Sequence, residues 1–324
     1  MLALDTSALR NKHNLLAFSA GVDSSALFFL LQEEGISFDI AIVNYQTREQ
    51  SKEELRHAKA LAKKYKLFCH HINAPHYPTH FEEKARTFRY EFFESLIQIE
   101  GYDNLLTAHQ LDDQLEWLLM RLSRGAGLYE LLGLHSITQK PSYKLIRPLL
   151  SHPKASLLDY LNTHQHPYFI DQSNSDEKYE RNQFRQSFSH PFMQKYSQGI
   201  QRSFAYLHQD KALLESGFET IYQEGSLYII KLYEAKSKAK ACDLRLKQLG
   251  YLLSASQRKE ITQEGSLVIG EKWAIESKDD LVYISPYLDI AMPKTFKESC
   301  RVAKIPNKIR AYLFQEDISP SSLP

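Results

Sequence analysis

The stretch AFSAGVDSSAL, residues 17–27, leads from an apolar run into a helical pattern and decides the fold. Its centre, Ser19–Ser24, is small and polar, and Gly21 permits a tight turn between a strand and a helix. Backbone N–H groups at such a helix start bind anions well, because the helix dipole adds partial positive charge. The loop has no GxxxxGK[ST] lysine and carries Asp23 instead. The sequence of this loop fits both a phosphate-binding site and an ordinary strand-to-helix turn with a capped helix.

Strand and helix patterns alternate outward from this loop through the first 150 residues. We expect strands at 14–18, 38–44, 67–72 and 104–108, and helices at 24–34, 53–65, 81–99 and from about 111. Short apolar strands alternating with amphipathic helices predict an α/β fold, a Rossmann-like parallel sheet with helices on both faces. Ligands of such sheets bind at the carboxyl ends of the strands, where Ser19–Ser24 and His109–Glu116 both begin.

The pattern changes after about residue 190. We expect a long polar-rich helix at 194–218, strands at 226–233, 266–276 and 281–285, and a helix at 238–249. The chain therefore divides into an α/β domain, residues 1–192, and a helical linker with a small α+β domain, residues 193–324. We expect residues 318–324 to be frayed.

Composition limits the class of protein. Hydrophobic residues make up 43% and charged residues 24% of the 324, as in globular proteins. No apolar run reaches the about 18 residues of a membrane helix, and no signal-peptide pattern is present. The three cysteines form no CxxC pair, which argues against a cysteine-rich metal site and favours a cytoplasmic location. Because the net charge is only +1, a nucleic-acid partner requires a local basic patch.

A second polar cluster follows the fourth expected strand. At about 100° per residue, one third of the helix circumference, opposite a leucine face, contains His109, Asp112, Asp113 and Glu116. Clustered acids repel one another unless a cation joins them, so we favour a functional role over a solvated face. No second histidine stands at zinc spacing.

Several motifs together resemble those of the N-type ATP pyrophosphatases, the PP-loop superfamily. SAGVDS at 19–24 is similar to the SGGxDS loop, with Ala20 in place of the first glycine. One branch, the tRNA(Ile)-lysidine synthases, shares further motifs: ARTFRY at 85–90, TAHQLDDQLE at 107–116, RLSRGAG at 121–127, RPLL at 147–150, DQSN at 171–174 and RNQFR at 181–185. Tyr45 departs from the histidine that many members have.

The resemblance implies a ligase that forms a carbon–nitrogen bond on the wobble cytidine of the CAU-anticodon isoleucine tRNA. The cytidine O2 would attack the α-phosphate of ATP, and the ε-amine of L-lysine would then displace AMP from C2. Mg²⁺ is expected with the pyrophosphate leaving group, and Asp23 would hold the metal or the lysine ammonium. In this reading residues 193–324 contain the tRNA-binding domain.

The resemblance also implies a set of site residues. Those for ATP are Ser19, Ala20, Gly21, Val22, Asp23 and Ser24. The catalytic candidates are Asp23, His109, Asp112, Asp113 and Glu116. The candidates for tRNA or α-phosphate contacts are Arg86, Arg89, Arg121, Arg124, Arg181, Asn182 and Arg185.

Three alternatives stay open. A tRNA sulfur transferase of the same superfamily would usually need paired cysteines. Another amide-forming ligase would share the loop but not need the Arg-Asn-x-x-Arg segment. An inactive nucleotide-binding module is suggested by Ala20, and ATP–pyrophosphate exchange would exclude it. The sequence does not decide which acid binds lysine, the metal count, how the tRNA is selected, or whether the protein is a monomer or a homodimer.

Overall fold

The computed structural model describes residues 2–46, 50–77, 79, 81–170 and 180–324. They form two compact units, Met1–His208 and Gln209–Pro324. The DQSN motif, residues 171–174, lies outside the described residues. The boundary expected at residue 192 falls inside a helix that continues to Glu215.

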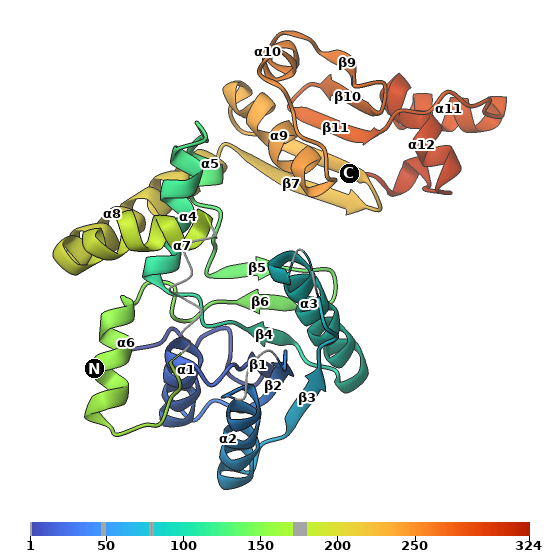
Figure 1. Ribbon diagram of the computed structural model, residues 1–324. Coiled ribbons are helices and arrows are strands. Elements are labelled where there is room, and N and C mark those ends of the chain that lie inside the picture. Colours follow the sequence, from blue (N-terminus) through green and yellow to red (C-terminus); the bar gives the residue numbers. More distant parts are fainter. Residues whose placement is uncertain (1, 47–49, 78, 80, 171–179) are drawn as a thin grey trace. The chain divides into compact units, whose positions relative to one another are not determined.

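The first unit is built on a six-stranded sheet of order β3-β2-β1-β4-β6-β5 (Figure 1). The strands are β1 (Asn14–Ala17), β2 (Phe38–Asn44), β3 (Cys69–Asn73), β4 (Asn104–Leu106), β5 (Ile137–Gln139) and β6 (Lys144–Ile146). Every neighbouring pair is parallel except β5 and β6. The predicted parallel α/β sheet is therefore confirmed.

Helices cover both faces of this sheet, because side chains alternate sides along a strand. Leu16 and Leu106 face the core under α1 (Val22–Glu33), α2 (Gln50–Tyr65) and α6 (Lys154–Thr163). Their neighbours Leu15 and Leu105 face the core under α3 (Phe81–Glu100), on the opposite side (Figure 1). This two-sided burial explains why β1, β2 and β4 are largely apolar.

The remaining helices of the first unit are the one that follows β4 and those that pack against it. They are α4 (Leu111–Leu122), α5 (Leu128–Leu131), α7 (Glu180–Phe184) and α8 (His190–Glu215), with a π-helical turn, Arg185–Ser189, between α7 and α8. Leu111 and Leu115 pack against Met193 and Phe204 of α8. The predicted leucine face of α4 is therefore core at Leu111 and Leu115 and partly buried at Leu118, whereas Leu122 at the end of the helix is 55% exposed.

The second unit has an antiparallel sheet of order β7-β8-β11-β10-β9. Its elements are β7 (Phe218–Glu224), β8 (Leu227–Leu232), α9 (Lys238–Gln248), α10 (Ala255–Gln263), β9 (Ser266–Ile269), β10 (Trp273–Lys278), β11 (Leu281–Pro286), α11 (Lys294–Val302) and α12 (Arg310–Gln315). Ile230 and Ile275 face the core that contains α9 and α10, whereas Ile229 and Ala274 face the core that contains α12.

Three expectations for this region are wrong. The strand expected at 266–276 is a hairpin, because Gly270 and Glu271 take positive φ angles of 57° and 55° and turn the chain. The long helix ends at Glu215, and Phe218 opens β7. The C-terminal residues are not frayed: Ile318 is 4% exposed within the core, and its N–H donates to the Leu313 carbonyl at 2.9 Å.

Candidate active site

A cavity of about 610 Å³ lies at the carboxyl ends of β1 and β4. These strands are neighbours, although β2 and β3 stand between them in the chain, so the strand order changes direction here. The segments that follow β1 and β4 leave in different directions and open a crevice, which is the usual ligand site of such sheets. The Ser19–Ser24 loop and the start of α4 both line the cavity, as the sequence predicts.

The loop holds its shape through its own serines and one strained residue. Ala20 takes the left-handed conformation, with a φ angle of 60°, whereas the φ angle of Gly21 is −75°. An alanine there costs about 1–2 kcal/mol. The Ser24 hydroxyl binds the Ser19 N–H at 3.2 Å and donates to the Gly21 carbonyl at 3.2 Å. The Ala20 carbonyl accepts the N–H of Phe169 at 2.9 Å, which ties the loop to the segment after α6.

Asp23 lies in the first turn of α1 and borders the cavity. Its Oδ1 is buried and has no hydrogen-bond partner among the described residues. Burial raises the pKa of Asp23 to about 7; Asp113 and Asp112 add to the rise, while Lys154 and Arg185 oppose it. A buried carboxylate without a partner is costly, so the site is prepared to receive a cation or a donor from outside the chain.

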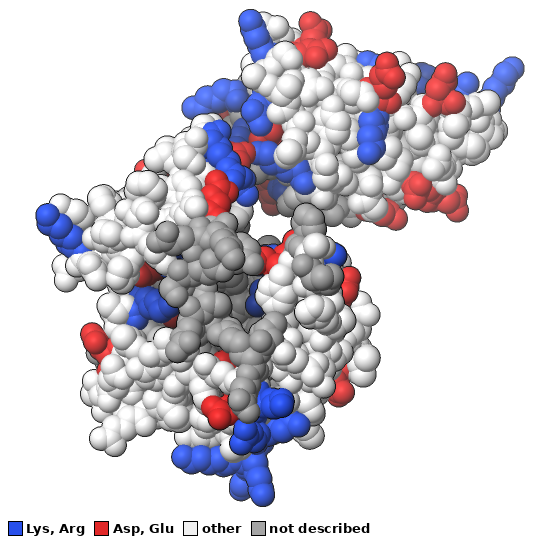
Figure 2. All heavy atoms as spheres, in the orientation of Figure 1, with Lys and Arg blue, Asp and Glu red and all other residues white. Residues whose placement is uncertain are grey.

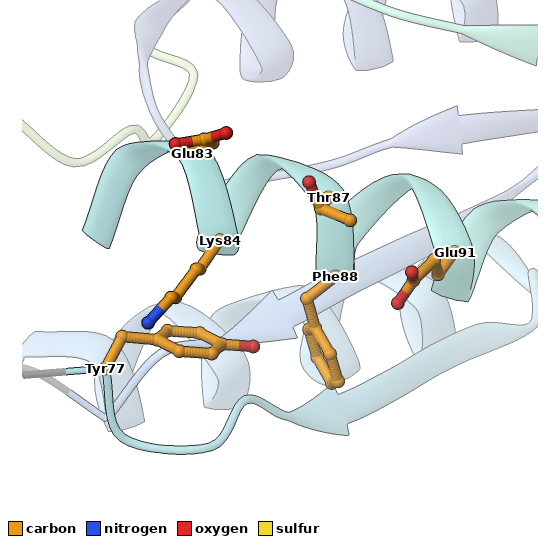
Figure 3. A pocket seen from close by; sticks show the side chains of 6 residues that line it. All are labelled: Tyr77, Glu83, Lys84, Thr87, Phe88 and Glu91. Atoms are coloured by element: carbon orange, nitrogen blue, oxygen red, sulfur yellow. The ribbon is translucent and has the colours of Figure 1, made fainter. Parts of the chain in front are cut away.

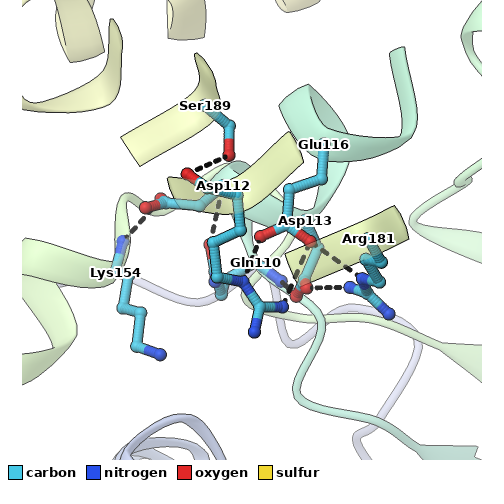
Figure 4. Close-up of polar contacts among 8 residues, drawn as sticks. Gln110, Asp112, Asp113, Glu116, Lys154, Arg181 and Ser189 are labelled. Atoms are coloured by element: carbon cyan, nitrogen blue, oxygen red, sulfur yellow. Dashed lines mark hydrogen bonds and ion pairs between the residues drawn. The ribbon is translucent and has the colours of Figure 1, made fainter. Parts of the chain in front are cut away.

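The acids of α4 share one face, but two of them already meet cations of the chain (Figure 4). Glu116 is 1% exposed and accepts from Arg181 Nε at 2.8 Å and Arg185 Nε at 2.6 Å. Arg181 also donates through Nη2 to Asp113 Oδ1 at 2.5 Å. The two arginines come from α7 and the π-helical turn, so they offset the repulsion that the sequence indicated among these acids.

Asp112 faces the start of α6 instead. Its Oδ2 accepts the backbone N–H of Lys154 at 3.0 Å (Figure 4), and its own N–H donates to Gln110 Oε1 at 2.5 Å. Burial raises the pKa of Asp112, and Asp113 and Glu116 act in the same direction, whereas Lys154 opposes them. Within the part of the chain that the structure describes, no arginine is paired with Asp112 or Asp23.

His109 contacts Thr107 Oγ1 through Nδ1 at 3.0 Å. Burial lowers the pKa of His109 to about 4, and the positive charges of Arg147, Arg181 and Arg86 contribute, although Asp113 opposes them. The imidazole is therefore neutral at pH 7.

The other predicted phosphate contacts are spread more widely. Arg89 lines the cavity. Arg86 lies over the ring of Tyr90 at 4.9 Å, and Arg121 lies over the ring of Trp117 at 4.3 Å. Arg124 pairs with Glu180 at 2.5 Å. Asn182 is 8% exposed.

Sequence reasoning missed Lys154 and Phe169, which both line the cavity. Lys154 follows RPLL and Pro153 at the start of α6, and that position at a helix start is a signal that could have drawn attention to it. Tyr45, noted as a departure from the family, also lines the cavity and donates to the Ala85 carbonyl at 3.2 Å.

Two surface features lie outside this cavity. A hollow of about 470 Å³ on α3 is lined by Tyr77, Glu83, Lys84, Thr87, Phe88 and Glu91, and includes none of the predicted residues (Figure 3). Basic side chains gather at the end of the first unit where α2 lies (Figure 2). No helix in the described part of the chain is long and apolar enough to cross a membrane.

Comparisons with known proteins agree with the motifs. A family model described as a PP-loop domain matches residues 3–190. Three curated proteins called tRNA(Ile)-lysidine synthase are similar over nearly the whole chain. That of Campylobacter jejuni is 45% identical and covers 98% of this chain and 97% of its own; that of Wolinella succinogenes is 44% identical and covers 96% and 95%. That of Helicobacter pylori is 42% identical and covers 95% and 91%.

Proposed function

The chain belongs to the tRNA(Ile)-lysidine synthase family of PP-loop proteins, and from this premise we propose how its residues perform the reaction. The enzyme joins L-lysine to C2 of the wobble cytidine of the CAU-anticodon isoleucine tRNA and converts ATP to AMP and pyrophosphate. The relatives favour this reaction over the sulfur transferase considered from the sequence. The observation that carries the mechanism is Asp23 Oδ1, a buried oxygen within the Ser19–Ser24 loop that has no hydrogen-bond partner among the described residues.

In the first step, the loop holds the phosphates of ATP. The serine hydroxyls and the backbone N–H groups at the start of α1 face anionic oxygens. The cytidine O2 forms a bond to the α-phosphorus, the bond from that phosphorus to the bridging oxygen breaks, and pyrophosphate leaves with the electron pair. Mg²⁺ suits a carboxylate together with phosphate oxygens and would offset the charge of pyrophosphate. Asp23 is the residue that would hold it, because its Oδ1 is buried and unpartnered.

In the second step, lysine arrives as a cation, because its ε-amine has a pKa near 10.4. Asp112 would receive this ammonium, since Asp113 and Glu116 are already paired with arginines. The amine must lose a proton before it attacks C2, and AMP then leaves. A base is most effective when its pKa lies near the working pH. The pKa of His109, about 4, makes it a poor base, whereas burial raises the pKa of Asp112 above its ordinary value, which favours this carboxylate as the acceptor.

The tRNA contacts are a further part of the proposal. Arg89 and Arg185 line the cavity and would meet phosphates nearest the target base. The phosphates of the neighbouring tRNA backbone would be contacted by Arg86, Arg121, Arg124, Arg181 and Asn182. Each phosphate neutralised by a basic side chain releases counterions, so tRNA affinity should fall steeply with salt. The second unit, Gln209–Pro324, would add contacts beyond the anticodon loop.

The test is incubation of the protein with bulk bacterial tRNA, ATP and labelled lysine. Label should enter only the minor isoleucine tRNA with a CAU anticodon. Asp23→Asn should lose tRNA-dependent exchange of pyrophosphate into ATP. Asp112→Asn should keep this exchange and require more lysine. Label in several tRNAs, or in none, would overturn the proposed function, and equal behaviour of the two variants would overturn the division of roles.

A further inference from the structure

We propose that Lys154 binds the terminal phosphates of ATP and so supplies, from another element, the cation that the Ser19–Ser24 loop lacks. The inference rests on the proposed function, because it takes ATP to occupy this cavity. Lys154 is the first residue of α6 and stands 130 positions after Ser24 in the chain. Its side chain lines the same cavity as the loop.

The ammonium group of Lys154 is available. Its Nζ makes no hydrogen bond or ion pair within the described ranges, and the side chain is half-buried. Figure 4 shows its backbone N–H directed at Asp112 while the side chain extends away from the acids and arginines of α4 and α7. Arg181 and Arg185, by contrast, are held by Glu116. Lys154 can therefore meet a ligand without breaking an ion pair.

The position of Lys154 relative to the loop is held by packing. Leu157 and Leu161 of α6 share one core with Leu27 and Leu31 of α1, the helix that starts at the loop. Tyr160 of α6 also donates to Glu33 of α1 at 2.6 Å. The N–H of Lys154 is fixed to Asp112 at 3.0 Å. The backbone of Lys154 is therefore fixed beside the loop, and only its side chain has to become ordered when a ligand binds.

The charges of the site also call for this cation. The positive charge of Lys154 acts on both Asp23 and Asp112, with which no arginine among the described residues is paired. A triphosphate in the cavity would face these carboxylates, so it needs positive charge on its outer phosphates. As the bond to the bridging oxygen breaks, charge accumulates on pyrophosphate, and an ammonium beside it stabilises the leaving group.

A second explanation must be separated from this one. Lys154 could act solely on the two carboxylates and make no contact with the nucleotide. In that case its loss would alter the binding of ATP and AMP alike. A contact with the terminal phosphates affects ATP alone, because AMP has only the α-phosphate.

The experiment measures binding of ATP and of AMP to the full chain by calorimetry with Mg²⁺ and without tRNA. Lys154→Gln should weaken ATP binding about ten- to hundredfold, as expected for loss of a charge-assisted contact. AMP affinity should change by less than about threefold, within the noise of a neutral substitution. Lys154→Arg should recover most of the ATP affinity, because it keeps the charge. Lys63→Gln, an exposed lysine in the last turn of α2, is the matched control and should bind both nucleotides as the wild type does.

Two results would overturn the inference. Equal weakening of ATP and AMP would assign Lys154 to the carboxylates alone, and unchanged ATP affinity would remove it from the site. If the wild-type protein binds no ATP, the proposed function itself fails. Thermal unfolding of each variant shows whether a loss of binding reflects a loss of fold. Lys154→Met, which also removes the charge, provides the test if Lys154→Gln does not fold.

Discussion

Asp23→Asn should make the protein more stable while abolishing lysine transfer. The pKa of Asp23 is raised from 3.8 to about 7, chiefly by burial. Each pKa unit corresponds to about 1.4 kcal/mol, so ionising this side chain in the fold costs about 4 kcal/mol more than in the unfolded chain. The folded state binds this proton more tightly, and stability therefore falls as the pH rises from about 4 to about 7. Above that range the full penalty persists.

The magnitude depends on pH, which makes the reasoning testable. At pH 8 nearly the full penalty applies, whereas at pH 5 Asp23 is mostly protonated in the fold and only about 2 kcal/mol remains. Asparagine has a similar shape and does not ionise. The stabilisation by Asp23→Asn should therefore be larger at pH 8 than at pH 5 by about 2–3 kcal/mol. Groups that do not interact with Asp23 contribute equally to both proteins and cancel in the comparison.

The assay is urea unfolding of the nucleotide-free protein at pH 5 and pH 8. A Trp273→Phe background leaves Trp117 as the only tryptophan of the chain, so fluorescence follows the first unit, which contains the site. Parallel curves for wild type and Asp23→Asn at both pH values would refute the reasoning. So would a variant that is less stable than wild type at pH 8, because Asp23 would then have a partner that the fold does not show.

Further results are expected for variants at Glu116, His109 and Ala20. Glu116→Gln should destabilise the first unit by about 2 kcal/mol in urea, because it leaves Arg181 and Arg185 without the buried acid that they share; an unchanged midpoint would contradict this. Burial lowers the pKa of His109 to about 4, so wild type should lose about 2 kcal/mol more than His109→Gln between pH 7 and pH 4.5, and equal losses would count against a neutral imidazole. Ala20→Gly should change stability by less than about 1 kcal/mol and keep ATP binding, because relief of the positive φ offsets the lost methyl group and the added chain entropy. Ala20→Val should lose ATP binding, and normal binding would mean that the loop tolerates another backbone conformation.

The sheet of the first unit was predictable because its strands are buried on both sides. The expected strand at 38–44 coincides with β2, and the one at 14–18 differs from β1 by one residue. The hairpin of β5 and β6 was missed, because its strands have three residues each and mix polar with apolar side chains. β7 was missed for a related reason: its sequence, FETIYQE, is largely polar, and its pairing with β8 makes it a strand.

The candidate site was predictable in its local parts. The loop and the polar face of α4 could be read from residue spacing, and the α/β pattern placed both at one edge of the sheet. The pairing of Glu116 with Arg181 and Arg185 joins residues more than 60 positions apart, so no local pattern reveals it. Lys154 reaches the cavity only because α6 packs against α1.

The sequence by itself determined the order of the elements, the loop after the first strand and the acids after the fourth, because these depend on neighbours along the chain. The tertiary structure decided which charges meet and how deeply they are buried. Asp23 shows the difference: its place at a helix start is local, but its pKa near 7 arises from burial among segments that the fold brings together. Burial and long-range charge are properties of the packed molecule, and they turn an aspartate in a phosphate loop into the unpartnered acid of this site.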